Sequence, residues 1–310
     1  MNDIENLARK EILELKPYSS ARGAINEKGL VYLDANENPF GNRLNRYPDP
    51  LQDVLKKRIG AVKNIPQENL FLGNGSDEIL DLIIRVFCRP GIDNMATIDP
   101  SYGMYEVLAQ INNVEVRKAP LSKNFEFQPG EFLSMCDENT RVAILCSPNN
   151  PTGNLLNQGE VLKVLNSFRG IVLIDEAYID FSDFKGFAEE IDNYPNLVVL
   201  RTFSKAWGLA GIRLGYAVAN SWIVHLLNKV EHAYNISRMT QKKALAALRK
   251  PGNTNRVIRK LNIEKDKLVK KLNAFSFVKQ VYPSDANFLL VKVINAKELV
   301  DFLRENRIII

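Results

Sequence analysis

The chain has 310 residues, which is enough for one large or two modest domains. It carries 41 Lys and Arg against 36 Asp and Glu, a net charge of +5, and 45% of its residues are apolar. These values are close to globular averages and argue against a disordered or fibrous chain. No apolar run approaches the roughly 18 residues of a membrane-spanning helix, and the polar start argues against a signal peptide. We therefore expect a soluble, cytoplasmic protein without a membrane partner.

Cysteines and local charge narrow the function classes further. Cys88, Cys136 and Cys146 are odd in number and widely spaced in apolar surroundings, so we expect core residues rather than a disulfide framework or a metal site. The excess positive charge lies between Arg256 and Lys271, where seven basic residues accompany two acidic ones. No aromatic residues are interleaved with these charges, so we expect a solvated helix face and no nucleic-acid partner.

Apolar runs typical of strands alternate with helix-like segments along the chain. We expect a helix over residues 79–87, strands over 96–98 and 141–145, a helix over 161–168, and strands over 171–174, 197–200 and 287–291. Short runs without a polar face, separated by helices, are typical of a parallel sheet covered on both sides. The pattern predicts an α/β fold with an arm over residues 1–30, a large domain over 31–245 and a smaller α/β domain over 246–310.

Polar residues follow three of the expected strands. Asn150, Asp175 and Lys205 are separated by 25 and 30 residues, each about one strand-helix-strand unit. Each of them alone would more often be a helix cap or a loop residue. Ligands of open parallel sheets bind beyond the carboxyl ends of the strands. Adjacent strands could therefore deliver the three side chains to one cleft.

Three segments around these residues carry a family resemblance. They are SPNNPTG at 147–153, DEAY at 175–178 and TFSKAWGLAGIRLG at 202–215, and they resemble the signatures of fold-type I aminotransferases that depend on pyridoxal 5′-phosphate (PLP). The segments 17–22, 33–39, 45–48 and 75–78 are similar to those of the histidinol-phosphate aminotransferase family. This resemblance implies a mainly parallel sheet flanked by helices, with a smaller C-terminal α/β domain, and PLP as the cofactor.

The resemblance also implies roles for individual residues. Lys205 would bind the PLP aldehyde and move a proton, Asp175 would pair with the pyridine nitrogen, and Tyr178 would donate to the ring oxygen. A lysine amine, a buried carboxylate and a phenol suit these tasks. Further cofactor contacts would come from Ser76, Asp77, Tyr102, Asn150, Thr202, Ser204 and Arg213, and from Tyr47 of a neighbouring subunit. Gly-Ser-Asp at the start of a helix would by itself be only a cap.

Substrate recognition is where the sequence departs from the family pattern. The family binds the anionic end of its substrate with arginines of a C-terminal segment, and this sequence ends at Ile310, where that segment is expected to begin. The small domain is therefore expected to be incomplete, and Tyr18, Asn36 and Asn154 are the remaining expected substrate contacts. No metal site is expected.

The resemblance implies a homodimer with a shared active site that exchanges the amino group between L-histidinol phosphate and 2-oxoglutarate. The products would be imidazole acetol phosphate and glutamate, in histidine biosynthesis. Three alternatives stay open: an aromatic aminotransferase, a phosphothreonine decarboxylase, and a chain that binds PLP without turnover.

Overall fold

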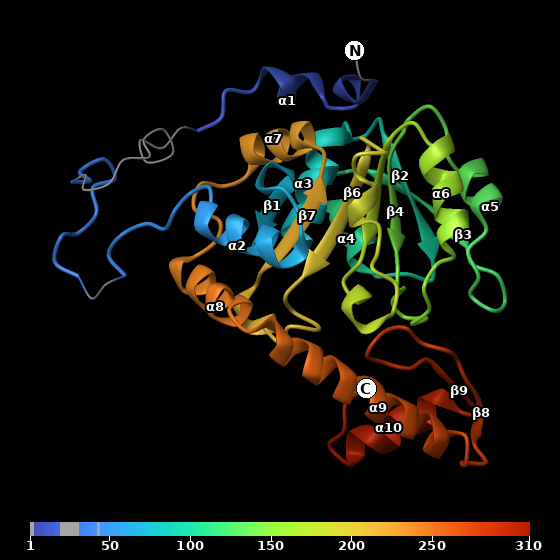
Figure 1. Ribbon diagram of the computed structural model, residues 1–310. Helices are drawn as coiled ribbons and strands as arrows, with labels where there is room; N and C mark the ends of the chain where they lie inside the picture. The colour runs from blue at the N-terminus through green and yellow to red at the C-terminus, as the bar shows by residue number, and fades with distance from the viewer. Residues whose placement is uncertain (1–2, 19–30, 42–43) are drawn as a thin grey trace.

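A seven-stranded sheet forms the centre of the computed structural model, which describes residues 3–18, 31–41 and 44–310 (Figure 1). Residues 19–22 of the segment 17–22 lie outside this part. The strands are β1 (Leu70–Gly73), β2 (Asn94–Asp99), β3 (Glu115–Pro120), β4 (Thr140–Cys146), β5 (Ile171–Asp175), β6 (Leu197–Thr202) and β7 (Gly215–Ala219). Their order is β1-β7-β6-β5-β4-β2-β3. Only β7 is antiparallel to its neighbours, so the expected mainly parallel α/β sheet is confirmed.

Two hydrophobic cores cover the two faces of the sheet. One contains side chains of α3 (Ser76–Phe87), α4 (Met104–Ile111) and α7 (Ser221–Val230). The other contains side chains of α2 (Asp53–Lys63), α5 (Pro129–Ser134), α6 (Gln158–Ser167) and α8 (Arg238–Leu248). Strand side chains alternate between the cores: in β5, Ile171 and Leu173 face the first, whereas Val172 and Ile174 face the second. Burial on both faces explains why these strands are continuous apolar runs.

The N-terminal segment packs against the helices of the first core. It contains η1 (Asp3–Asn6) and α1 (Lys10–Glu14), and Ile4 and Ala8 are buried. The backbone N–H of Arg9 donates to the carbonyl of Val86 at 3.0 Å, and Lys229 Nζ donates to the carbonyl of Leu13 at 2.8 Å. The segment is thereby attached to α3 and α7.

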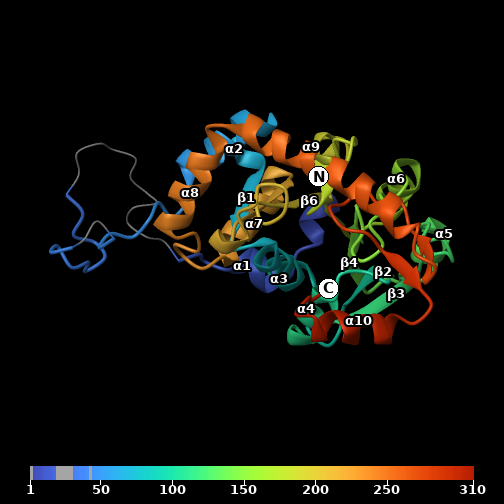
Figure 2. The ribbon, with the colours of Figure 1, turned by 90° about the horizontal axis from the view of Figure 1, so that it is seen from below.

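The C-terminal part lies below the sheet in Figure 1 and forms a separate small layer. It contains α9 (Pro251–Leu272), the antiparallel strands β8 (Val278–Val281) and β9 (Val291–Val293), and α10 (Ala296–Glu305). No residue of α9 is buried, in agreement with the expected solvated face. Seen from below, α9 runs from the side of α8 toward α6 and α5 (Figure 2). The ring of Phe288 meets that of Tyr178 at 5.1 Å, so this layer contacts the loop that follows β5.

The strand expected over residues 287–291 is wrong in its bounds, because only Val291 belongs to a strand. The carbonyl of Leu290 accepts from the backbone N–H of Tyr282 at 3.0 Å, whereas side chains bind carbonyls earlier in this segment. Lys265 Nζ donates to the carbonyls of Ser284 at 2.6 Å and Ala286 at 2.7 Å, and Ser284 Oγ donates to the carbonyl of Phe288 at 2.6 Å. The apolar run therefore forms a bend that packs against the sheet domain.

Candidate active site

The ends of β4, β5 and β6 meet at one edge of the sheet. Cys146 pairs with Asp175, and Asp175 pairs with Leu200, so the three strands are direct neighbours. The structure thereby brings together the residues that follow these strands, as the spacing predicted. Lys205 is exposed, and its Nζ lies 5.2 Å from the centre of the Tyr178 ring. Asn150 lies close enough to Tyr178 to act on its phenol, whose pKa it lowers against the larger effect of burial.

Asp175 is a buried carboxylate with a donor on each oxygen. Its side chain accepts a hydrogen bond from the hydroxyl of Tyr105 at 2.7 Å on Oδ2 and one from the backbone N–H of Ala177 at 3.0 Å on Oδ1. Burial raises the pKa of Asp175 to about 6, although both donors and the charge of Lys205 act in the opposite direction. The group is therefore ionised for the most part at neutral pH.

The first turn of α3 forms the second end of the site. Gly75 precedes the helix with φ +86°, and a Cβ atom there would lie 2.5 Å from Arg213 Nη2. On Gly215, a Cβ atom would lie 2.6 Å from the backbone nitrogen of Ser76. The two glycines thus let β7 and the guanidinium of Arg213 approach the exposed N–H groups of the helix start. A helix N-terminus beside an arginine is suited to an anion such as phosphate.

Asp77 links this anion end to the aromatic residues of α4 and the loop before it. The carboxylate lies 3.5 Å from Arg213 Nη2 and accepts a hydrogen bond from Tyr102 at 3.4 Å. Burial raises the pKa of Tyr102 to about 12, so this phenol keeps its proton at neutral pH. The ring of Tyr102 meets that of Tyr105 edge-on at 5.5 Å. Tyr105 was not among the expected site residues.

The turn that carries Lys205 is held by its own side chains. Thr202 Oγ1 donates to the carbonyl of Leu214 at 3.4 Å and accepts from the backbone N–H of Ser204 at 3.1 Å. Arg213 has φ +50°, in the left-handed region that non-glycine residues rarely adopt. This strained position lies at the site itself, as is common for functional residues.

Four of the expected site residues have their described contacts elsewhere. Tyr47 stacks on Tyr234 with ring centres 4.5 Å apart, and Asn36 lines a neighbouring groove of about 570 Å³. The side chain of Asn154 donates to the carbonyl of Phe125 at 3.1 Å. Tyr18 is 79% exposed. No described contact joins any of these four side chains to Lys205.

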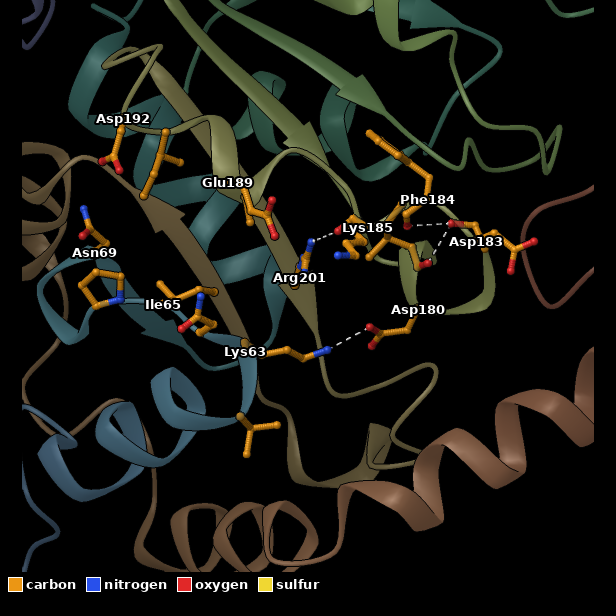
Figure 3. Close-up of a pocket in the computed structure, with 17 residues that line it drawn as sticks. Lys63, Ile65, Asn69, Asp180, Asp183, Phe184, Lys185, Glu189, Asp192 and Arg201 are labelled. Atoms are coloured by element: carbon orange, nitrogen blue, oxygen red, sulfur yellow. Dashed lines mark hydrogen bonds and ion pairs between the residues drawn. The ribbon is translucent and has the colours of Figure 1, made fainter.

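A separate cavity of about 510 Å³ lies between the end of α2 and residues 179–192 (Figure 3). Lys63 Nζ donates to Asp180 at 2.9 Å, and Arg201 pairs with the buried Glu176 at 2.7 Å. Arg201 and Thr202 are consecutive in β6, so their side chains point to opposite faces of the sheet. Lys63 and Arg201 are thus paired with carboxylates that follow β5, and these ion pairs stabilise the loop that begins there.

In residues 3–18, 31–41 and 44–310, no helix has both the length and the apolar character to cross a membrane. In the same ranges, no three His, Cys, Asp or Glu side chains are grouped so that they could hold a metal ion.

The side chains at the strand ends fit PLP by their chemistry. An accessible amine on Lys205 matches the aldehyde, and the buried Asp175 carboxylate matches the pyridine nitrogen. The phenol of Tyr178 and the amide of Asn150 match the ring oxygen. The space kept by Gly75 beside Arg213 matches the phosphate.

Comparisons with known proteins agree with this fit. A family model described as "Aminotransferase class I and II" matches residues 30–310. Histidinol-phosphate aminotransferase of Parabacteroides distasonis is 49% identical over all of this chain and 90% of its own length, and that of Bacteroides thetaiotaomicron is 48% identical with the same coverage. The crystal structure of the Clostridium acetobutylicum enzyme of that name is similar with a TM-score of 0.79 and 28% identity, over 86% of this chain and 80% of that one. The chain therefore belongs to the class I and II aminotransferases and, within them, to the PLP-dependent histidinol-phosphate aminotransferase family.

Proposed function

We propose that this chain transfers the amino group of L-histidinol phosphate to 2-oxoglutarate, which gives imidazole acetol phosphate and glutamate in histidine biosynthesis. Relatives of 44% to 49% identity carry the corresponding name. One observation carries the proposal: Lys205 and the buried Asp175 follow neighbouring strands. The guanidinium of Arg213 lies close to them, beside the first turn of α3. When bound, PLP supplies an aldehyde that takes up the amino group and a ring that withdraws electrons from the substrate carbon.

Lys205 is the proposed proton carrier. Its amine is accessible, and it lies over the ring of Tyr178 rather than in an ion pair of the described residues. An amine in this place can attach to an aldehyde, and when it is free it can take up the proton that leaves the α-carbon of the substrate.

Asp175 is proposed to hold a proton on the pyridine nitrogen. A carboxylate that is buried and ionised at neutral pH interacts strongly with a cation, because little water screens the pair. Tyr178 and Asn150 would donate to the ring oxygen, and the plane of Tyr102 would pack against the ring. The phosphate would be held by the backbone of Ser76 and Asp77 and by the side chains of Thr202, Ser204 and Arg213.

We also propose a homodimer in which Tyr47 reaches the phosphate of the partner chain. Residues 31–41 and 44–51 project from the body of the molecule in both views (Figures 1 and 2). This segment exposes large apolar side chains: Val31 is 81% exposed, Leu33 84% and Phe40 89%. Such a segment is stabilised when a second copy covers it, and Tyr47 lies on the same segment.

The remaining expectations are supported to different degrees. We propose residues 31–245 as the cofactor-binding domain and 246–310 as the small domain, because the long helix α9 starts at Pro251. Asn154 Oδ1 is buried without a hydrogen-bond partner in the described part of the chain, which supports a substrate contact. No described contact of Tyr18 or Asn36 supports the substrate contacts expected for these two residues. The three free cysteines support a reducing, cytoplasmic location.

The proposal is tested by an amino-donor screen on the purified protein loaded with PLP. We expect glutamate from 2-oxoglutarate with histidinol phosphate as the donor, and no glutamate with Lys205→Ala. Preference for an aromatic amino acid, carbon dioxide from phosphothreonine, or bound PLP without product would each contradict the proposal and favour one of the three alternatives.

A further inference from the structure

Tyr105 places its hydroxyl against the most deeply buried carboxylate of the site. The residue lies in the first turn of α4, is 1% exposed, and donates to Asp175 Oδ2 at 2.7 Å. This distance lies within the range of about 2.5–2.7 Å for hydroxyl-to-carboxylate bonds, which are among the stronger hydrogen bonds in proteins. Burial raises the pKa of Tyr105 well above its ordinary value, so the hydroxyl keeps its proton at neutral pH.

The other groups that face Asp175 cannot replace this donor. The thiol of Cys146 donates to the carbonyl of Pro148 at 3.4 Å, and the Asp77 carboxylate makes ionisation of Asp175 harder. Lys205 favours the ionised form, but its amine is committed to the aldehyde when the cofactor is bound. The phenols of Tyr102 and Tyr178, with pKa values raised to about 12, remain neutral. Within the part of the chain that the structure describes, the donor to the second oxygen is the backbone N–H of Ala177.

We propose that Tyr105 is a positioning residue of this aminotransferase site: its hydroxyl fixes the orientation of the Asp175 carboxylate and keeps it ionised for the cofactor nitrogen. The inference rests on the proposed role of Asp175. Tyr105 itself is expected to touch neither substrate nor cofactor, because its hydroxyl is used by the carboxylate.

The substitution Tyr105→Phe tests the proposal, because it removes the hydroxyl and keeps the ring that contacts Tyr102. A hydrogen bond to a charged group contributes about 1.5–3 kcal/mol, which corresponds to a rise of about 1 to 2 pH units in the pKa of Asp175. We expect this rise, from about 6, in the carboxyl titration of the cofactor-free protein, followed by infrared difference spectroscopy against Asp175→Asn. An unchanged titration would overturn the proposal.

The affinity for PLP gives a second readout. At pH 7 the ionised fraction of Asp175 falls in Tyr105→Phe, so PLP should bind about two- to tenfold more weakly, and the difference should close at pH 9. An equal loss at both pH values would indicate a structural defect and overturn the proposal. Tyr216→Phe is the matched control, because it removes the hydroxyl of another buried tyrosine. It should leave the affinity and its pH dependence unchanged.

The double variant separates this inference from the proposed function. In an Asp175→Asn background, Tyr105→Phe should cause no further loss of PLP affinity. If Asp175→Asn alone changes nothing, the proposed function of Asp175 fails; if only Tyr105→Phe changes nothing, the present inference fails. If Tyr105→Phe does not fold, a measurement on the wild-type protein still tests the inference. A slowly exchanging hydroxyl proton of Tyr105 should titrate with Asp175 at about pH 6, and its absence would contradict the proposal.

Discussion

A methyl group at Gly75 should strain the backbone at the start of α3. The residue has φ 86° and ψ 164°, a region that is essentially restricted to glycine. Placing alanine there costs about 1–3 kcal/mol of backbone strain. For a chain of this size each kcal/mol lowers the melting temperature by about 2–4 °C. We therefore expect Gly75→Ala to melt about 2 to 12 °C below the wild type, as followed by circular dichroism.

The same methyl group should weaken phosphate binding more than it weakens the fold. The new Cβ would lie 2.5 Å from Arg213 Nη2 and 3.2 Å from Cζ. The side chain of Arg213 is 50% exposed, so it can move away and leave the helix start. Loss of one charge-assisted hydrogen bond costs about 1.5–3 kcal/mol, which corresponds to roughly 10- to 100-fold in the dissociation constant of PLP. Fluorescence titration of the cofactor-free protein measures this constant.

Pyridoxal, which lacks the phosphate, is the matched ligand for this experiment. Its affinity should be nearly the same in Gly75→Ala and in the wild type, and Arg213→Ala should abolish the effect of Gly75→Ala on PLP. Gly130→Ala is the matched control, because Gly130 has open space around its Cβ position and lies in α5. An unchanged PLP affinity, or an equal loss for pyridoxal, would refute the phosphate assignment at Gly75 and Arg213.

Three further predictions concern charge, attachment and assembly. Burial raises the pKa of Asp175 from its ordinary 3.8 to about 6, so the folded cofactor-free protein binds this proton more tightly than the unfolded chain and loses stability as the pH rises between these values. Asp175→Asn should remove the cost of burying an ionised carboxylate, about 3 kcal/mol at pH 8. The melting temperature of the variant should therefore exceed that of the wild type at pH 8 but not near pH 4. Equal melting temperatures at pH 8 would contradict this prediction. Lys205→Ala should abolish borohydride-dependent covalent attachment of PLP, measured by mass spectrometry, and persistent labelling would exclude Lys205 as the attachment site. Inactive Tyr47→Ala and Lys205→Ala chains, when mixed and refolded together, should regain up to about a quarter of the wild-type activity. In a mixed dimer, one of the two sites has both Lys205 from one chain and Tyr47 from the other. Sedimentation as a monomer, or no recovery of activity, would contradict a shared site.

The strand ends could be predicted from the sequence because the signals were local and periodic. The apolar runs that became β4, β5 and β6 are each followed by a polar residue, and their spacing of one strand-helix-strand unit made them neighbours in the sheet. The glycine before α3 and the arginine after β6 were found through motifs. Local sequence therefore sufficed for the residues that lie on loops beside these strands.

Other features depend on contacts between distant segments and left no such signal. Tyr105 is a buried aromatic residue of a helix by its pattern, and only the 2.7 Å contact across 70 residues gives its hydroxyl a partner. β7 pairs with β6 in the antiparallel direction after the connecting segment 203–214, and its apolar composition does not indicate that direction. Lys265 of α9 donates to the carbonyls of Ser284 and Ala286, and Ser284 donates to Phe288, in the bend found where the strand was expected to begin.

The central claim is that these strand ends hold PLP for amino transfer from histidinol phosphate. A single-turnover experiment tests it most directly: the protein loaded with PLP is mixed with one equivalent of histidinol phosphate in a stopped-flow spectrometer, and 2-oxoglutarate is added afterwards. We expect loss of the visible absorption of the bound cofactor with formation of imidazole acetol phosphate. The absorption should then return as one equivalent of glutamate appears. An unchanged spectrum with histidinol phosphate, in a protein whose spectrum does change with an aromatic amino acid, would contradict it.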